Sequence, residues 1–179
     1  MSLIRLITRL PGMQEHLFPV ISQTGIRYDS GYLVRQRDRV RVMPEDSPTP
    51  GERWPYATFQ TEDGQTMSSY ALIYYAFHHL FLFVPAAEVS AALDLKETLE
   101  QTLRLQIHIV TPRRQAGTLN CDLTTFAQFN SGGSTVYLVR PDAYLSLSAD
   151  VRNLKTIPSL LQRYFSAPTT HQQLFSVEH

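Results

Sequence analysis

The stretch Thr135-Val136-Tyr137-Leu138-Val139-Arg140-Pro141-Asp142-Ala143-Tyr144-Leu145-Ser146-Leu147 decides the fold, because it predicts two short strands joined by a tight turn. Pro141 fixes its own φ angle and favours extended backbone at Arg140, while the Asp142 carboxylate can accept bonds from nearby amides. After the turn, apolar and polar residues alternate. This pattern predicts a half-buried strand with Ala143, Leu145 and Leu147 on one face. The more continuously apolar run before the turn predicts a deeper position in the sheet.

The composition is that of an ordinary globular protein. The chain has 179 residues, of which 43% are hydrophobic and 18% are charged, and its 16 basic side chains balance 16 acidic ones. This balance argues against a nucleic-acid partner, which would favour a basic face. The only cysteine, Cys121, excludes an internal disulfide and fits a reducing compartment. The apolar run Leu80–Val84 is far too short to span a bilayer. We therefore expect a cytoplasmic protein that does not bind membranes.

Residues 1–45 are expected to form a helical and extended arm. Apolar residues recur at helical spacing in residues 3–10 and 13–21, and Pro11-Gly12 separates the two patterns. Further along, Arg35, Arg37, Arg39 and Arg41 occupy alternate positions. If this segment is extended, the arginines share one edge, which could meet an acidic or phosphate partner or simply face solvent.

Residues 46–166 are expected to form one α/β domain, and residues 167–179 a polar tail. A proline-rich loop opens the domain. A hairpin around Glu62-Asp63-Gly64 follows it, and then a helix over residues 71–76 capped by Ser68 or Ser69. Strands are predicted at 80–84 and 105–110 and helices at 89–103, 123–129 and 157–165, with the hairpin of residues 135–147 before the last helix. The resulting βαβαββα order, in which a crossover helix joins parallel strands, is thioredoxin-like.

Three short motifs within this order resemble one family. They are Gly25-Ile26-Arg27-Tyr28, Pro50-Gly51-Glu52-Arg53-Trp54-Pro55 and Val139-Arg140-Pro141-Asp142-Ala143-Tyr144-Leu145. Their order and spacing are similar to those of the carboxy-terminal region of flavin-dependent aromatic hydroxylases, the phenol hydroxylase and chlorophenol monooxygenase group. The family usually has aspartate in place of Glu52, and glycine is common in place of Ala143.

The resemblance implies that the chain contains parts of two domains. Residues 1–45 would be the end of a flavin and substrate domain, and the rest a thioredoxin-like C-terminal domain without redox function. FAD and NAD(P)H would serve the parent monooxygenase, an oxidoreductase that hydroxylates a phenolic or polyketide ring. The chain has no GxGxxG dinucleotide fingerprint, so we expect no catalytic, cofactor-binding or metal site in it. Its partners would be the flavin domain and possibly a second copy. The alternative is a free-standing binding or assembly module of the same fold.

Redox chemistry has no candidate residue. Where a working thioredoxin carries its cysteines, this chain reads Pro85-Ala86-Ala87-Glu88, and Ser131-Gly132-Gly133-Ser134 stands where such folds place a cis-proline. A peroxiredoxin-like or glutathione-type enzyme would need a thiol near residue 86. Cys121, in a polar loop, is interpreted as an incidental thiol.

The remaining polar candidates favour structural roles. Adjacent His78 and His79 point to opposite faces of a strand and cannot easily share a metal, and His108 is expected on the polar face of its strand. Asp122 could mimic a catalytic cluster with Thr124 or Thr125, but a helix cap explains it better. Arg140 and Asp142 have two interpretations: a contact across a domain or subunit interface, or a turn in which Asp142 holds the backbone. In the second, Arg140 pairs with an acid such as Asp142 or Glu52.

Overall fold

The computed structural model describes residues 47–130 and 132–165. The expected arm, the motif at residues 25–28, the arginine series and the polar tail lie outside these residues. The described part forms a single mixed sheet in the order β2-β1-β5-β4-β3-β6-β7. The strands are Thr58–Gln60 (β1), Thr66–Ser68 (β2), His78–Phe83 (β3), Leu105–Thr111 (β4), Leu119–Asn120 (β5), Ser134–Val139 (β6) and Leu145–Val151 (β7).

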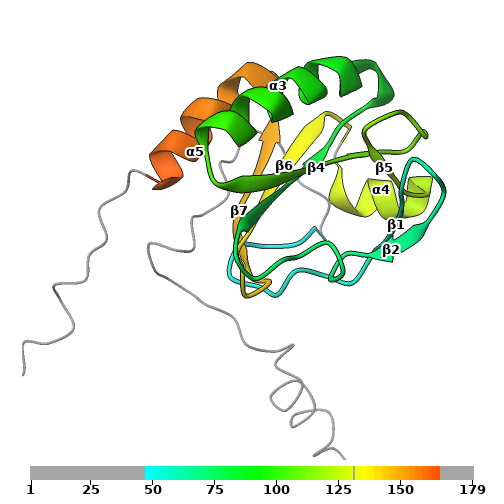
Figure 1. Cartoon of the computed structure of the whole chain (residues 1–179), viewed down its shortest axis with the longest axis horizontal. Coiled ribbons are helices and arrows are strands. Elements are labelled where there is room, and N and C mark those ends of the chain that lie inside the picture. The colour runs from blue at the N-terminus through cyan, green and yellow to red at the C-terminus, as the bar shows by residue number, and fades with distance from the viewer. Residues whose placement is uncertain (1–46, 131, 166–179) are drawn as a thin grey trace, which may run out of the picture.

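Within the described residues, three α-helices pack on the sheet, and they are Val89–Thr102 (α3), Leu123–Phe129 (α4) and Ile157–Phe165 (α5). Short 3₁₀ turns, Ala86–Glu88 (η1) and Leu154–Thr156 (η2), precede α3 and α5. Figure 1 shows α3 and α5 together on one face of the sheet and α4 on the other.

The central four strands confirm the thioredoxin-like prediction. Strand β3 pairs in parallel with β4 and antiparallel with β6, and β6 pairs antiparallel with β7. Parallel β3 and β4 are joined by α3, as the crossover rule requires. The order from β3 is therefore β3-α3-β4-α4-β6-β7-α5, with the two-residue strand β5 added between β4 and α4. The predicted hairpin around Glu62-Asp63-Gly64 is also present as β1 and β2.

Two separate hydrophobic cores lie on the two faces of the sheet. The aliphatic core lies under α3 and α5, because alternate residues of β3 and β4, such as Leu80 and Ile107, point to that side. The aromatic core lies on the other face and includes Trp54, Phe81 and Tyr137 together with Phe129 of α4. Central strands covered on both faces read as continuous apolar runs, which explains the sequence of Leu80–Val84.

The prediction of a helix over residues 71–76 is wrong. Residues 69–77 form two successive turns, in which Ile73 N–H donates to the Tyr70 carbonyl and Phe77 N–H donates to the Tyr74 carbonyl. Ser68 does cap the first of them, because its hydroxyl accepts the Ala71 amide at 3.1 Å. The turn does not propagate, because the Tyr74 backbone amide and carbonyl both lie at hydrogen-bonding distance, 2.8 and 3.0 Å, from the His79 ring.

The expected faces of β7 are also wrong. Leu138 pairs with Leu147 but Val139 pairs with Leu145, so the register shifts by one residue at a β-bulge. Because a bulge reverses the alternation, Leu145 enters the aromatic core while Leu147 enters the aliphatic core. All seven residues of β7 are buried, in contrast to the half-buried strand that the alternation predicts.

Candidate functional site

The end of β3 is where a thioredoxin-like fold would hold reactive thiols, and here it carries a carboxylate and a hydroxyl. Residues 86–88 form η1, and Glu88 precedes the first residue of α3. The Ser134 hydroxyl, at the start of β6, donates to Glu88 Oε2 at 2.6 Å. The Gln115 side-chain amide, from the loop after β4, donates to the Ala86 carbonyl at 3.3 Å. This arrangement fixes the loop and places a hydroxyl and a carboxylate, in place of thiols, at the end of β3.

Asn130 organises the loop that precedes β6. Its side-chain amide nitrogen donates to the carbonyls of Phe83 at 3.1 Å and Gly133 at 2.6 Å, and its Oδ1 accepts the Gly132 amide at 2.7 Å. Gly132 has φ of 97°, a conformation that a residue with a side chain rarely adopts. Asn130 therefore ties the end of β3 to the start of β6.

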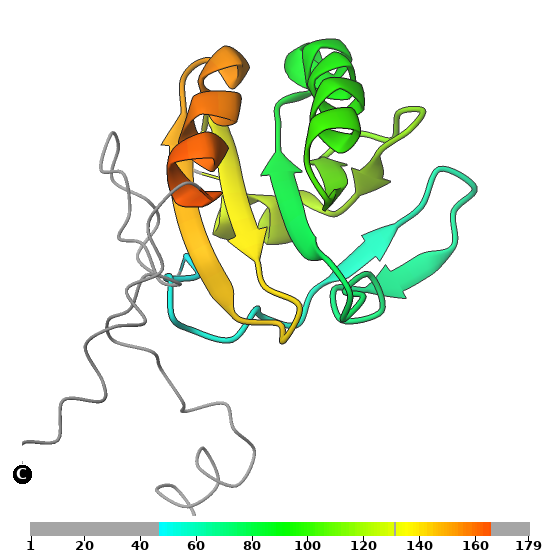
Figure 2. The ribbon, with the colours of Figure 1, turned by 60° about the vertical axis from the view of Figure 1, so that its left-hand side comes forward.

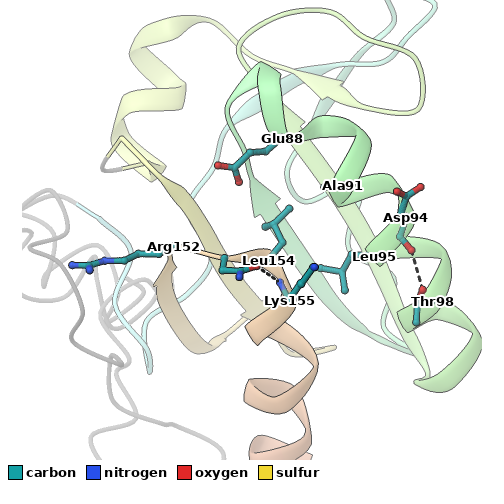
Figure 3. A pocket seen from close by; sticks show the side chains of 9 residues that line it. Glu88, Ala91, Asp94, Leu95, Thr98, Arg152, Leu154 and Lys155 are labelled. Atoms are coloured by element: carbon teal, nitrogen blue, oxygen red, sulfur yellow. Dashed lines mark hydrogen bonds between the residues drawn. The ribbon is translucent and has the colours of Figure 1, made fainter.

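A pocket of about 470 Å³ opens beside Glu88, between α3 and the segment that connects β7 to α5. Figure 3 shows Glu88 and Asp94 on the α3 side and Arg152 and Lys155 on the other. Leu95 and Leu154 contribute apolar surface. The pocket thus has acidic and basic walls, but among the described residues no group of three potential metal ligands occurs here or elsewhere.

Cys121 is not placed for redox chemistry. It follows β5 and is buried in the aromatic core, 4% exposed, whereas the sequence suggested a polar loop. Burial, together with the negative charge of Asp122, raises the pKa of its thiol to about 12. Because the thiolate is the reactive form, this environment makes the thiol inert near neutral pH.

Asp122 is a helix cap, as predicted. Its Oδ1 accepts the Thr125 amide at 2.9 Å, and its Oδ2 accepts the Thr125 hydroxyl at 2.7 Å. These bonds stabilise the carboxylate and lower the pKa of Asp122. The carboxylate therefore satisfies free amides at the start of α4.

His78, His79 and His108 each pack against neighbouring rings. His78 packs edge-on against Tyr164 and Phe165, while His79 points to the opposite face. There His79 Nδ1 lies 3.0 Å from His108 Nε2, and the two rings stack. His108 also stacks on Phe81, so its strand face is part of the aromatic core and is not the polar surface expected.

Two of the motifs quoted above are in contact. The Gly51 amide donates to the Leu145 carbonyl and the Trp54 amide donates to the Ala143 carbonyl, each at 2.8 Å. The Leu145 amide donates in return to the Glu52 carbonyl at 2.8 Å. The proline-rich loop is therefore paired along the hairpin turn, although the two segments are about 90 residues apart in sequence.

Within the turn, Arg140 and Asp142 make the contacts that the structural interpretation expected. Arg140 pairs with Asp142 at 2.5 Å, and Asp142 Oδ1 accepts the Tyr144 amide at 3.3 Å. The Glu52 carboxylate accepts the amide of Thr49 at 3.0 Å. Ala143 closes the turn with a positive φ of 65°, which explains why glycine suits this position in the family that the sequence resembles.

Trp54 is the residue that sequence reasoning missed. It is fully buried, its ring stacks on Phe81 at 4.7 Å, and it lies within 5.4 Å of the rings of Phe129 and Tyr137. The Tyr70 hydroxyl donates to its carbonyl. The sequence did contain a signal for this role, because the single tryptophan of the chain lies within a loop motif. A large aromatic residue in such a loop usually anchors the loop to a hydrophobic core.

Comparison with known proteins gives the fold. No model of a protein family and no curated protein sequence matches the chain. Among solved structures, the flavin-dependent monooxygenase PieE, in complex with FAD and substrate, matches over 79% of this chain with a TM-score of 0.56 and 19% identity. Aklavinone-11 hydroxylase, with FAD and aklavinone, matches over 79% of this chain with a TM-score of 0.53 and 21% identity.

A thiol peroxidase from Chromobacterium violaceum matches over 72% of this chain and 95% of its own, with a TM-score of 0.50 and 12% identity. By contrast, the match covers 25% of PieE and 26% of aklavinone-11 hydroxylase, so the chain spans about a quarter of the length of these two proteins. At these identities the matches establish a shared α/β, thioredoxin-like fold. No helix within the described ranges has the length and apolar character needed to cross a membrane.

Proposed function

We propose that this chain is the non-catalytic, thioredoxin-like C-terminal domain of an FAD-dependent aromatic-ring monooxygenase, in which it serves interdomain packing or a dimer contact. The observation that carries the proposal is the pairing of Gly51 and Trp54 with Leu145 and Ala143. These segments are two of the three motifs that resemble the aromatic hydroxylases, and their mutual contact gives a physical reason for their joint occurrence.

Two further observations support a role without redox chemistry. The end of β3 carries a Glu88–Ser134 hydrogen bond where the fold would hold thiols, and the pKa of Cys121 is raised to about 12. The likeness to parts of PieE and aklavinone-11 hydroxylase supports FAD as the cofactor of the parent enzyme. The resemblance of the sequence motifs implies NAD(P)H as the reductant of that enzyme. The domain itself would contact the flavin and substrate domain of that parent.

The alternative is a free-standing binding or assembly module of the same fold without redox activity. The match over 95% of a thiol peroxidase supports it, because in that protein the fold makes up nearly the whole chain. The chemistry of a peroxidase is not proposed here, since Cys121 is the only cysteine and is buried.

The first test is the native reading frame, because an upstream in-frame GxGxxG domain favours the monooxygenase and a stop codon just before Met1 favours the module. The second test titrates the purified chain with FAD and then adds NADPH. We expect neither flavin fluorescence quenching nor NADPH oxidation by the chain alone. Flavin binding at low micromolar affinity would contradict the non-catalytic role.

A further inference from the structure

The pocket between α3 and the connection from β7 to α5 is the feature that the proposed function leaves unexplained. In Figure 2, as in Figure 1, α3 (green) and α5 (orange) lie next to each other along the same face of the sheet. The volume of the pocket, about 470 Å³, falls within the range of small-molecule sites, roughly 300–1,000 Å³. Leu154 of the aliphatic core and Leu95, which packs against that core, give the pocket an apolar floor.

The α3 wall of the pocket carries hydrogen-bond acceptors. Glu88 is held in place by Ser134, which is 2% exposed and donates its hydroxyl to Glu88 Oε2 at 2.6 Å. Among the described residues, Glu88 Oε1 accepts no hydrogen bond, and the carboxylate of Asp94, further along α3, accepts none either. This wall therefore suits a cation that donates N–H bonds, such as an ammonium group.

The opposite wall carries hydrogen-bond donors. Asn153 Oδ1 accepts the Lys155 amide at 3.0 Å, which orients the side chain of Asn153 and leaves its NH₂ group as a donor. Within residues 47–130 and 132–165, the Lys155 ammonium forms no ion pair, and Figure 3 shows its side chain extending toward Leu95 of α3. An ammonium and an amide donor on one wall suit a carboxylate.

We propose that this pocket binds a small zwitterion of dipeptide size, with its ammonium group at Glu88 and Asp94 and its carboxylate at Asn153 and Lys155. A ligand with one charge would meet one wall of its own sign, whereas a zwitterion complements both walls. A free amino acid carries both charges on one carbon, but a dipeptide separates them and can reach both walls. Apolar side chains of the dipeptide would cover the floor of the pocket.

This inference goes beyond the proposed function and does not rest on it, because residues of this domain alone form the site. The test is binding of the dipeptide leucyl-leucine to the full chain, followed by the amide NMR signals of residues 88–98 and 152–155. N-acetyl-leucyl-leucine lacks the ammonium group and leucyl-leucinamide lacks the carboxylate. We expect leucyl-leucine to shift these signals saturably, and each blocked ligand to bind about fivefold more weakly or worse.

Two variants assign the two charges of the ligand to their walls. Lys155→Met should weaken the binding of leucyl-leucine and should bind leucyl-leucinamide equally well, because the carboxylate has lost its partner. Glu88→Gln with Asp94→Asn should bind leucyl-leucine and N-acetyl-leucyl-leucine equally, and glutamine at position 88 keeps an acceptor for Ser134. Thermal unfolding checks that both variants fold.

The matched controls are Lys96→Met and Glu97→Gln, which remove the same charges from α3 outside the pocket lining. Both should leave the affinity for leucyl-leucine unchanged, and a loss equal to that of the pocket variants would overturn the proposal. Equal binding of the three ligands to the parent chain would also overturn it. So would signal shifts confined to other residues, or no shift at about 10 mM leucyl-leucine. These outcomes are separate from the reading-frame and FAD tests of the proposed function.

Discussion

The amide of Trp54 donates a 2.8 Å hydrogen bond to the carbonyl of Ala143, and this bond joins a proline-rich loop to a hairpin turn. Both residues are buried, at 0% and 5% exposed, and both belong to the aromatic core. The turn can hold its shape because Trp54 anchors the loop beneath it, while Ala143 adopts the left-handed conformation that brings its carbonyl to the loop. These two residues therefore make the loop part of the folded core.

Trp54→Ala should lower the free energy of unfolding by about 3–5 kcal/mol, because it removes the largest buried ring of the aromatic core. Trp54→Phe should cost less, about 1–2 kcal/mol, since the smaller ring still stacks on Phe81 and the indole Nε1 has no hydrogen-bond partner among the described residues. Urea unfolding followed by circular dichroism measures both. Equal losses in the two variants would show that ring stacking at this position contributes nothing.

Ala143→Val should destabilise the protein by about 2 kcal/mol or more, because a β-branched residue at a φ of 65° is strained and its site is closely packed. Ala143→Gly should change stability by less than about 1 kcal/mol, because relief of backbone strain offsets the loss of one buried methyl group. Thermal and urea unfolding of the two variants check the difference. A valine variant as stable as the glycine variant would mean that the turn has another conformation.

Asp142→Ala should lower the free energy of unfolding by about 1 kcal/mol, the usual contribution of a local hydrogen bond. The carboxylate accepts the Tyr144 amide and pairs with Arg140 across the turn. Asp142→Asn is the control, since it keeps an acceptor for Tyr144 and removes the charge. A stability unchanged in Asp142→Ala would favour the other interpretation of this pair, a contact across a domain or subunit interface.

The pattern of the sequence was sufficient for the central fold. The apolar runs of β3 and β4, the 3.6-residue periods of α3 and α5, and the Arg140-Pro141-Asp142 turn are local signals, so they could be read without any tertiary information. The helix predicted over residues 71–76 failed, because its backbone is held by the ring of His79 and that contact is tertiary. Helix propensity depends on the local sequence, so it cannot predict a tertiary hydrogen bond that competes with the helix.

The register of β7 could not be predicted for a related reason. The alternation after the turn was read correctly as a strand, but the bulge between Leu145 and Leu147 exchanges the faces. The bulge lies next to the turn, where Ala143 and Leu145 are hydrogen-bonded to the Trp54 loop, and that contact is tertiary. The candidate site was also predicted only in part. The absence of thiols near residue 86 was plain from the sequence, whereas the Glu88–Ser134 bond depends on how far apart β3 and β6 lie in space.

Cys121 should react very slowly with iodoacetamide in the folded protein. At pH 8 a thiol with an ordinary pKa near 9 is about one-tenth ionised, whereas a pKa of about 12 leaves roughly one part in ten thousand as thiolate. We therefore expect alkylation about a thousandfold slower than in the urea-unfolded chain, which serves as the control. Comparable rates in the two states would place the thiol at the surface and reopen a redox role.

The buried histidine pair should make stability depend on pH between about 6.5 and 3. Burial, with the nearby charges of His79 and Lys96, lowers the pKa of His108 to about 3, and burial also lowers the pKa of His79. Below pH 6.5 the unfolded chain therefore binds protons that the folded chain does not. The resulting stabilisation is complete above pH 6.5 and is lost as the pH falls, by at most about 1.4 kcal/mol per pH unit for each histidine.

The substitution His108→Gln removes one of the two histidines and so tests its share of this pH dependence. The variant should be somewhat less stable than the parent at pH 7.5, because it loses the stacking on Phe81 and the contact with the His79 ring. Between pH 6 and pH 4.5, however, its stability should fall less steeply, because one group that titrates only in the unfolded chain has been removed. Urea unfolding at each pH gives the two slopes, and the Asp and Glu carboxylates, which also titrate in this range, affect both proteins alike. Parallel curves over this range would show that His108 keeps an ordinary pKa and lies in contact with solvent.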